Sequence, residues 1–222
     1  GKLAKTLGVS DASIRRDLIE MQTLGFLDRT HGGAVIAEGA EETSLFLRIN
    51  ENAAEKEQAA ANALPHLPRF DSVFFDGSTT ALALAARMDL AGKTVMTTNL
   101  QTALQLSERE GVRVMVPGGT VTAGSVAGSW TNSQLPEFEF DLLICSCSAL
   151  TLDGAYETSL DLRELKRIAF AHAQKHVLVL DRSKLQKTAG YFLPPLSGFD
   201  LIVFDYLSRE EKSRFSGFPV VG

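Results

Sequence analysis

Short apolar runs alternate with helical segments from about residue 70 to the C-terminus, and this alternation constrains the fold more than any other feature of the sequence. The runs SVFFD, KTVMTTN, VRVMV, FDLLICSCSA, HVLVLD and FDLIVFD have the length and apolar character of buried strands. Segments with helical patterning, such as TALALAARM, QTALQLSERE and LRELKRIAFAHAQ, follow several of them. Continuous apolar strands that alternate with helices are typical of a mainly parallel sheet with both faces covered. The sequence therefore predicts an α/β domain over residues 57–222.

Polar residues follow four of these predicted strands. Ligands of open parallel sheets bind beyond the carboxyl ends of the strands, so these residues are candidates for a binding site. The end after SVFF has one glycine, three hydroxyl side chains and the N–H groups of a helix start, which together can cradle a phosphate without a lysine. An N-capped turn between strand and helix would have the same residues. The Gly-Lys-Ser/Thr ending of a P-loop is absent, which argues against nucleotide hydrolysis.

The other three ends complete the candidate site. Thr97, Thr98 and Asn99 offer hydroxyl and amide groups, whereas the two glycines after VRVMV let the backbone approach a ligand closely. A lysine after HVLVLD is placed to bind an acidic group. The sequence predicts that the four ends converge on a small polyol phosphate, and the predicted ligand-binding residues are Asp76, Gly77, Ser78, Thr79, Thr80, Thr98, Asn99, Gly118, Gly119, Asp181 and Lys184.

The first 36 residues predict a helix, a turn, a second helix and a glycine-rich hairpin. Ser10 suits the N-cap of the second helix. On that helix the inward-facing apolar residues recur at helical spacing, namely Ile14, Leu18 and Met21. The opposite face carries Ser13, Arg15 and Arg16 and can enter a major groove, where arginine reads guanine and both residue types grip phosphates. A solvated surface helix with two arginines would have the same pattern.

Charge limits where nucleic acid can bind. The chain of 222 residues has a net charge of −5, which argues against general binding to nucleic acid. Residues 1–36 carry five Lys and Arg against four Asp and Glu, a net charge of +1, so the remaining residues carry −6. We therefore expect DNA contact only in the N-terminal segment. Because the phosphate attraction of one such segment is modest, two of them must pair, which predicts a homodimer or a homotetramer.

No metal or cofactor is predicted. Cys145 and Cys147 lie two residues apart in an apolar run without nearby histidines, so we expect buried, reduced thiols rather than a zinc site. The sequence has no run of about 18 apolar residues and no visible signal peptide, so we expect a cytoplasmic protein that binds no membrane. The small and acidic segment AEGAEETS predicts a linker over residues 37–44, within a connecting region over residues 37–56.

The N-terminal segment resembles the helix-turn-helix signature of DeoR-type bacterial transcriptional regulators. The matching residues are Leu3, Ala4, Leu7, Val9, Ser10, Ile14, Arg15, Arg16, Asp17, Leu18, Gly25, Leu27, Arg29, Gly32, Gly33 and Ala34. The resemblance implies a winged helix that contacts operator DNA, and we predict as contacting residues Ser10, Ser13, Arg15, Arg16, Arg29 and His31. Because the family's DNA-binding domain has another helix before this point, we expect an N-terminally incomplete domain over residues 1–36.

The rest of the chain resembles the DeoR C-terminal sensor domain, which is similar in fold to ribose-5-phosphate isomerase and binds phosphorylated sugars or related metabolites as effectors. The matches are Asp76 to Thr80, Thr98, Asn99, Gly118, Gly119, Asp141, Gly154, Lys166, Arg167, Asp181, Ser183 and Lys184, with Phe46, Arg48, Asn52, Glu55 and Lys56 in the connecting segment. One departure is that Ser78 stands where the family commonly has a glycine, so the anion cradle can differ. The match at Lys166 implies an effector contact, although a solvated lysine would fit the same helix.

These patterns predict a metabolite-responsive transcriptional regulator, a repressor of a carbohydrate-catabolism operon, with an effector-binding domain over residues 57–222. The alternative is a sugar-phosphate isomerase on the same fold. Its carboxylate base could be Asp76, Asp153 or Asp181, but the sequence lacks an isomerase-like Lys-Gly-Gly-Gly segment. We therefore expect no enzymatic activity.

Overall fold

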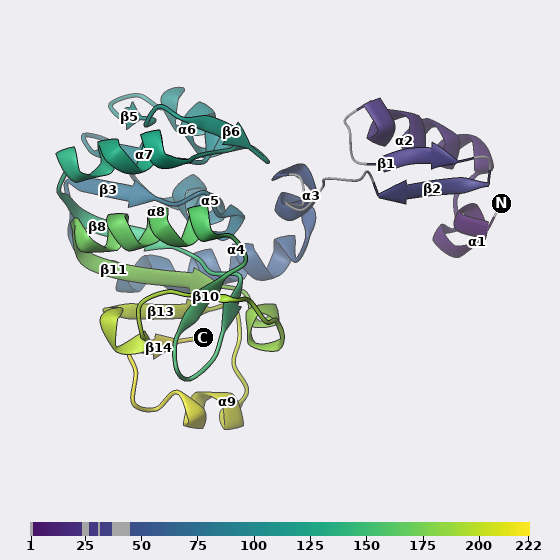
Figure 1. Ribbon diagram of the computed structural model, residues 1–222. Helices are drawn as coiled ribbons and strands as arrows, with labels where there is room; N and C mark the ends of the chain where they lie inside the picture. Colours follow the sequence, from purple (N-terminus) through teal and green to yellow (C-terminus); the bar gives the residue numbers. More distant parts are fainter. Residues whose placement is uncertain (1, 24–26, 31, 37–44) are drawn as a thin grey trace. The chain divides into compact units, whose positions relative to one another are not determined.

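The chain forms two compact units, residues 1–44 and 45–222, in a computed structural model that describes residues 2–23, 27–30, 32–36 and 45–222 (Figure 1). The predicted linker at residues 37–44 and the predicted DNA contact His31 lie outside the described residues. Residues 45–56, which the sequence analysis assigned to the connecting region, belong to the larger unit.

The smaller unit has the expected order of elements: α1 (Lys2–Leu7), α2 (Asp11–Thr23), β1 (Leu27–Thr30) and β2 (Gly33–Ile36). Gly8, with a φ of +66°, allows the turn that follows α1. Ser10 caps α2, because its Oγ accepts a hydrogen bond from the backbone N–H of Ser13 at 3.0 Å. The strands β1 and β2 pair antiparallel as a hairpin. The sequence prediction of a winged helix-turn-helix is thus confirmed.

A parallel sheet of seven strands forms the larger unit. Its strand order is β14-β13-β11-β8-β3-β4-β5, and every pairing in it is parallel. The strands are β3 (Ser72–Phe75), β4 (Thr94–Thr97), β5 (Arg113–Met115), β8 (Phe140–Cys145), β11 (Ala173–Leu180), β13 (Leu201–Phe204) and β14 (Val220–Val221). This architecture confirms the predicted α/β class.

Helices cover both faces of this sheet, as Figure 1 shows. One face packs on α4 (Ala53–Ala63), α5 (Thr79–Arg87) and α6 (Leu100–Ser107), and the other on α8 (Leu160–Ala171). The short helix α7 (Ser129–Gln134) lies against α8. Side chains alternate between the two cores along each strand, so Phe74 enters one core while Val73 and Phe75 enter the other. The unit also contains α3 (Leu45–Asn50) at its start and α9 (Arg209–Arg214) near its end.

Two small antiparallel sheets lie beside the main sheet. One is a hairpin of β6 (Thr120–Thr122) and β7 (Ser125–Ala127). The other pairs β10 (Ala155–Glu157) with β9 (Ala149–Leu150) and β12 (Tyr191–Phe192). These short elements follow the carboxyl ends of β5, β8 and β11, so they lie around the predicted binding edge.

The end of α8 differs from the sequence prediction, whereas the state of the two cysteines agrees with it. The helical segment LRELKRIAFAHAQ ends earlier than its pattern indicated, because α8 stops at Ala171 and β11 begins at Ala173. The backbone of His172 accepts a hydrogen bond from Phe140 at the start of β8, which favours the strand over a further helical turn. The thiols of Cys145 and Cys147 are free and buried in the same core, as predicted.

Candidate functional site

The loop between β3 and α5 presents a helix N-terminus at the carboxyl edge of the sheet. Ser78 caps α5, since its Oγ accepts from the N–H of Ala81 at 3.2 Å. The next two N–H groups, of Thr79 and Thr80, donate no hydrogen bond within the described part of the chain. Unpaired donors at the positive end of a helix dipole can bind anions, although Thr79 and Thr80 are themselves buried. The loop is therefore both an N-capped turn and a possible phosphate cradle.

Asp76 holds this loop in place. Its Oδ1 accepts from the N–H and the Oγ of Ser78 at 3.0 and 2.5 Å. Its Oδ2 accepts from the N–H of Ser146 at 3.1 Å and pairs with the Lys166 ammonium at 2.8 Å. With four donors around a fully buried carboxylate, Asp76 joins the ends of β3 and β8.

Lys166 lies in the core rather than in solvent, so the alternative of a solvated lysine is wrong. Its side chain is 7% exposed, and its Nζ contacts Asp76, Glu157 and the carbonyl oxygen of Ser146. Burial alone would lower the pKa of Lys166, but the carboxylates of Asp76 and Glu157 raise it above its ordinary value. The Lys166 ammonium thus links β10, the end of β8 and the first loop through ion pairs and a hydrogen bond. Its predicted contact with an effector stays a prediction.

Gly77 lies where no side chain fits. A Cβ on Gly77 would lie 2.6 Å from the Oγ of Ser125 and 3.6 Å from the Oγ1 of Thr98. Ser125 donates to the carbonyl oxygen of Gly77 at 3.2 Å, and so does the side-chain amide of Asn99. The hairpin β6–β7 therefore packs directly on the loop after β3, which fixes one wall of the candidate site.

Thr98 and Asn99 follow β4 and differ in their hydrogen bonding. Both polar atoms of the Asn99 side chain have partners. Its Nδ2 donates to Gly77, and its Oδ1 caps α6 by accepting from the N–H groups of Gln101 and Thr102. Thr98 is completely buried, and its Oγ1 has no partner among the described residues. A buried hydroxyl without a partner carries a free-energy cost that a ligand could relieve.

The turn after β11 brings another unpartnered oxygen to the same edge. The Oδ1 of Asp181 accepts from the N–H and Oγ of Ser183 and from the side chain of Asn52. The Oδ2 of Asp181 is buried and has no partner within the part of the chain that the structure describes. Lys184 lies in the short 3₁₀ turn Arg182–Gln186 and is partly exposed.

The corner between α3 and α4 brings Lys56 to the site. This lysine matches the family pattern, but the sequence did not predict that it binds a ligand. Lys56 is buried, and its Nζ donates to the carbonyl oxygens of Arg48 and Glu51, the latter at 2.6 Å. The Oγ1 of Thr79 donates to the same Arg48 oxygen at 3.2 Å. Burial lowers the pKa of Lys56 to about 8, while Asp181 raises it and Lys184 lowers it. Lys56 and Thr79 thus share the carbonyl oxygen of Arg48, while Asn52 of the same corner contacts Asp181 at the fourth polar end.

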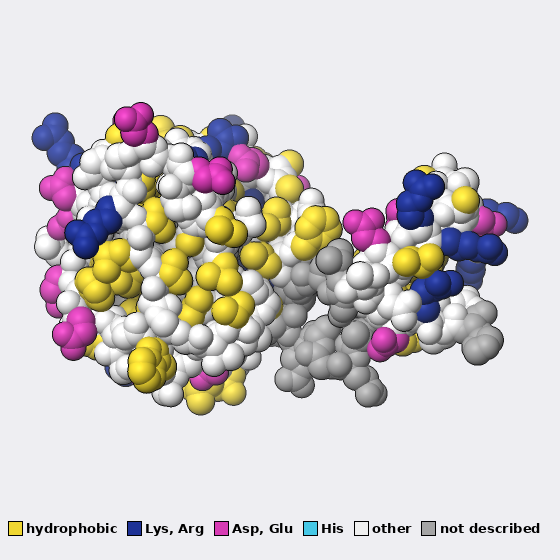
Figure 2. All heavy atoms as spheres, turned by 90° about the horizontal axis from the view of Figure 1, so that it is seen from above, with side chains coloured by type: hydrophobic (Ala, Val, Ile, Leu, Met, Phe, Trp, Pro, Cys, Tyr) yellow, Lys and Arg dark blue, Asp and Glu magenta, His cyan; other side chains and the backbone are white. Residues whose placement is uncertain are grey.

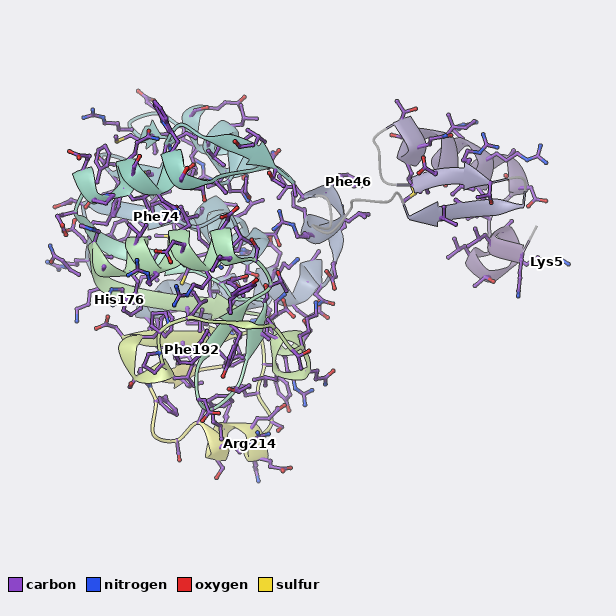
Figure 3. The ribbon with its side chains drawn as sticks, in the orientation of Figure 1. Lys5, Phe46, Phe74, His176, Phe192 and Arg214 are labelled. Atoms are coloured by element: carbon purple, nitrogen blue, oxygen red, sulfur yellow. The ribbon has the colours of Figure 1, made fainter. Side chains whose placement is uncertain are left out.

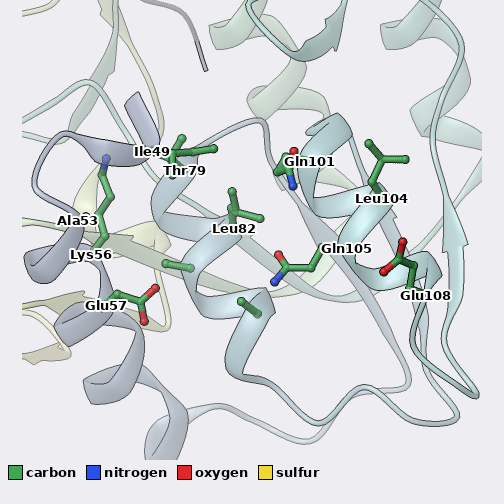
Figure 4. Close-up of a pocket in the computed structure, with 12 residues that line it drawn as sticks. Ile49, Ala53, Lys56, Glu57, Thr79, Leu82, Gln101, Leu104, Gln105 and Glu108 are labelled. Atoms are coloured by element: carbon green, nitrogen blue, oxygen red, sulfur yellow. The ribbon is translucent and has the colours of Figure 1, made fainter. Parts of the chain in front are cut away.

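A groove of about 470 Å³ opens beside the first loop, between α4, α5 and α6 (Figure 4). Lys56, Thr79 and Gln101 lie at the end of this groove nearest α3, as Figure 4 shows. Small and aliphatic side chains of α5 line the groove between its two ends, among them Leu82. Glu57, Gln105 and Glu108 also line the groove, and because its two carboxylates would repel an anion, a phosphate is favoured at the end that holds Lys56.

Gly118 and Gly119, the third predicted end, approach a helix. The N–H of Gly118 donates to Gln134 at 2.9 Å, and its carbonyl oxygen accepts from Thr131 and Gln134. A Cβ on Gly119 would overlap the Oγ1 of Thr131. The glycines thus let α7 pack on the turn after β5, and their contact with an effector stays a prediction.

The predicted DNA-contacting residues in the described ranges lie on the surface of the smaller unit. Ser10, Arg15, Arg16 and Arg29 are exposed, and Ser13 is half-buried. Ser13 also contacts Ser10 through their side-chain oxygens at 2.9 Å. The arginine-bearing face of α2 is therefore available for contact with DNA.

The described ranges contain no cluster of metal-binding side chains and no helix that could span a membrane. No group of three or more His, Cys, Asp and Glu side chains there is arranged to hold a metal ion. None of the helices in these ranges is long and apolar enough to cross a bilayer.

A helix-turn-helix unit together with an α/β unit that carries a polar site defines a ligand-sensing, DNA-binding regulator. Residues 51–206 match the DeoR C terminal sensor domain, and residues 1–40 match the DeoR-like helix-turn-helix domain. The chain belongs to the DeoR family of transcriptional regulators.

Three similar proteins are named as regulators. The HTH-type transcriptional regulator GolR of Listeria innocua is 30% identical over 99% of this chain and 89% of its own length. The regulator GlpR of Haloferax volcanii is 32% identical, with 94% and 85% covered. The glycerol-3-phosphate regulon repressor of Escherichia coli is 28% identical, with 92% and 82% covered.

Solved structures align with this chain at low sequence identity. The eIF2B delta chain of Chaetomium thermophilum aligns with a TM-score of 0.50 and 11% identity, covering 73% of this chain and 60% of that chain. Ribose 5-phosphate isomerase A of Methanocaldococcus jannaschii aligns with a TM-score of 0.41 and 12% identity, covering 60% and 54%.

Proposed function

We propose that this chain represses a carbohydrate-catabolism operon and that its larger unit binds a phosphorylated sugar or a related metabolite as effector. The observation that carries the proposal is the pair of unpartnered N–H groups of Thr79 and Thr80 beside the buried Lys56. These donors suit a phosphate dianion. The unpartnered Thr98 Oγ1 and Asp181 Oδ2 can bind hydroxyl groups of the carbon chain.

Lys56 gives this site a means to signal. Its Nζ donates to the carbonyl oxygens of Arg48 and Glu51 near the C-terminus of α3. A phosphate at the start of α5 would compete for the ammonium and remove a donor from these oxygens. Because a ligand shifts an equilibrium only through its differential affinity for two states, this exchange of partners supplies the required difference.

The helix α3 also contacts the turn of the β6–β7 hairpin through two residues. Arg48 donates from Nη2 to the carbonyl oxygen of Ala123 at 2.9 Å, at the turn of the β6–β7 hairpin. Gly124 in that turn has a φ of +78° and packs so closely on Leu45 that a Cβ would overlap it. A change at Lys56 therefore reaches the residues that follow the segment 37–44, and we propose that this segment relays it to DNA binding.

An isomerase would need a free carboxylate base. The geometry of Asp76 argues against that role, whereas Asp181, whose Oδ2 has no partner among the described residues, is the candidate that an isomerase assay has to test. Four donors already surround the Asp76 carboxylate. Asp153 lies on the exposed surface at the β9–β10 turn. An assay of ribose 5-phosphate conversion tests the alternative directly, because turnover would contradict a pure sensor.

A thermal-shift screen with sugar and polyol phosphates tests the effector proposal. A ligand at about 100 times its dissociation constant adds about 2.7 kcal/mol to the free energy of unfolding. We expect a shift with a phosphorylated compound that is lost in Lys56→Met and retained in Lys175→Met. Lys175 is a matched control because it lies at the opposite end of the sheet, where it pairs with Asp200 at 2.7 Å.

The same compound should release operator DNA from the wild-type protein in a gel-shift or anisotropy titration. Stabilisation only by unphosphorylated sugars would contradict the phosphate cradle. A ligand that stabilises the chain without altering DNA affinity would contradict the proposed relay through α3.

A further inference from the structure

A segment of 23 residues without a single charge, Val114 to Pro136, interrupts a chain in which 22% of residues are charged. It covers the end of β5, the hairpin β6–β7 and the helix α7. Although it lacks charge, it is not buried throughout. Val116, Val121 and Trp130 are 43%, 56% and 71% exposed. Large apolar side chains at such exposure, without charged neighbours in the sequence, mark an interaction surface.

These three side chains belong to one folded region. Trp130 packs on the turn after β5, since its Nε1 lies 3.0 Å from the position of a Cβ on Gly118. Gln134 holds the same turn through both backbone groups of Gly118. Val116 and Val121 lie two and three residues from Gly118, so chain geometry keeps them within about 11 Å of it. We call the exposed surface of residues 116–130 the uncharged face.

Figure 2 shows the side of the larger unit that carries α6, β6 and α7 in Figure 1. Hydrophobic side chains gather over its middle, whereas Lys, Arg, Asp and Glu side chains lie mainly toward its margins. The centres of protein interfaces are depleted in charged residues and enriched in tryptophan, and their rims are polar. The composition of the uncharged face has this pattern.

A sheet edge adjoins the uncharged face. The strand β5 is the last of the seven-stranded sheet, and in the described part of the chain it pairs only with β4. Native proteins protect such edges by short strands, by charges or by covering them. Here the strand has three residues and carries one charge, Arg113, so the edge itself is protected, and the exposed apolar side chains of the uncharged face are what a partner would cover.

We infer that the uncharged face is where a second copy of this chain docks about a two-fold axis. At a two-fold interface the same surface meets itself, so every charge near the axis would face its own image. The residues of this surface carry no charge of their own, which reduces this repulsion, and the guanidinium of Arg48, which contacts the surface, is bonded to the carbonyl oxygen of Ala123. A different partner protein would instead be selected by complementary charge, which this face does not offer. The need to pair two DNA-binding units of net charge +1 points to the same occupant.

Trp130 is the only tryptophan of the chain, so its fluorescence reports on this face without any substitution. We expect acrylamide quenching of Trp130 to increase on dilution, in step with a fall in sedimentation mass from twice the 24.0 kDa of one chain to that of one chain. The measurement uses the full chain without an effector, and its outcome does not depend on the effector proposal.

Two variants test the interface independently. Trp130→Glu and Val121→Lys place like charges against each other across the axis, and each should reduce the mass at least twofold while the far-ultraviolet circular dichroism stays unchanged. Tyr206→Glu is the matched control, since Tyr206 is 57% exposed and follows β13 toward the other edge of the sheet. It should keep the wild-type mass. A tetramer that falls to a dimer in the first two variants would equally support the inference.

Four results would overturn it. The first two are a wild-type chain that is monomeric at every concentration and an oligomer in which acrylamide quenches Trp130 as fully as in the monomer. The third is an unchanged mass in both face variants. The fourth is a Trp130 that is shielded from acrylamide in the monomer. The last result would mean that another part of the same chain covers the face.

Discussion

The side-chain amide of Asn52 donates a hydrogen bond to the carboxylate of Asp181, with 3.3 Å between Nδ2 and Oδ1. The same amide donates to the Oγ of Ser183 at 3.2 Å. These contacts join the α3–α4 corner to the turn after β11. Asn52 has a φ of +51°, a left-handed conformation that asparagine tolerates better than other non-glycine residues. One residue thus shapes the corner and ties it to the candidate site.

Replacing Asn52 separates these two roles. Asn52→Gly keeps the left-handed backbone and loses the amide, which should lower the free energy of unfolding by about 1 kcal/mol. Asn52→Ala also adds backbone strain of about 1 kcal/mol. Urea denaturation should therefore rank wild type, Asn52→Gly and Asn52→Ala in falling order. A glycine variant as stable as the wild type would mean that the amide contacts contribute nothing.

The lowered pKa of Lys56 makes stability depend on pH. Burial lowers this pKa from its ordinary value of 10.5 to about 8, so between these values the unfolded chain binds a proton that the folded chain does not. The free energy of unfolding should therefore rise with pH across this interval and level off above it. The wild type should gain stability relative to Lys56→Met from pH 8 to 10. Parallel curves for the two proteins would contradict the shift, and Lys175→Met provides the reference for removal of an exposed lysine.

The buried pair of Lys166 and Asp76 should be costly to break from one side. Lys166→Met leaves the carboxylates of Asp76 and Glu157 without their cation, and we expect a loss of about 3–5 kcal/mol in urea denaturation. Adding Glu157→Gln to this variant should recover part of the loss, because one uncompensated charge is removed. A loss below about 1 kcal/mol, as for an exposed lysine, would contradict the burial of this cluster.

Gly77→Ala should displace the β6–β7 hairpin from the first loop. The added Cβ would lie 2.6 Å from the Oγ of Ser125, and such overpacking costs about 1–3 kcal/mol. In a Ser125→Ala background the same change should cost less, since the nearest remaining atom, the Ser125 Cβ, lies 3.1 Å away. A double-mutant cycle measures this coupling. Equal costs in both backgrounds would mean that the strain arises elsewhere.

On the smaller unit, Arg16→Ala should weaken operator binding by about 1–3 kcal/mol if Arg16 reads a base. The dependence of binding on salt should then stay unchanged. A salt slope that falls by about one would instead assign Arg16 to a phosphate. Titrations of labelled operator DNA at several salt concentrations distinguish these roles, and unchanged affinity would remove Arg16 from the interface.

The sequence predicts those parts of the fold that depend on local pattern. The run SVFFD becomes β3 because alternate side chains enter two separate cores, and a strand covered on both faces must be apolar throughout. The capping roles of Ser10 and Ser78 follow from the preference of serine for helix starts. The boundary between α8 and β11 was missed because the backbone of His172 bonds to Phe140, more than thirty residues earlier in the chain.

The candidate site was harder to predict because its contacts join distant segments. The sequence identified the polar ends of the strands, but it did not indicate that Lys166 would bind both Asp76 and Glu157. Nothing in the alanine-rich pattern around Lys56 indicates that its ammonium turns back to the carbonyl oxygens of the preceding helix. The labelled side chains in Figure 3 come from both units and from many elements, and only Phe74 and His176 among them lie on strands of the main sheet.

The membership of α3 in the larger unit decides how chimeric regulators should be built. Leu45 packs on Gly124, and Arg48 forms hydrogen bonds with Ala123 and Thr79. A fusion that begins after α3 would therefore remove these contacts from the larger unit. A foreign DNA-binding domain should therefore be joined before Leu45. Biosensor designs that respect this boundary can exchange the DNA-binding unit while the larger unit stays whole.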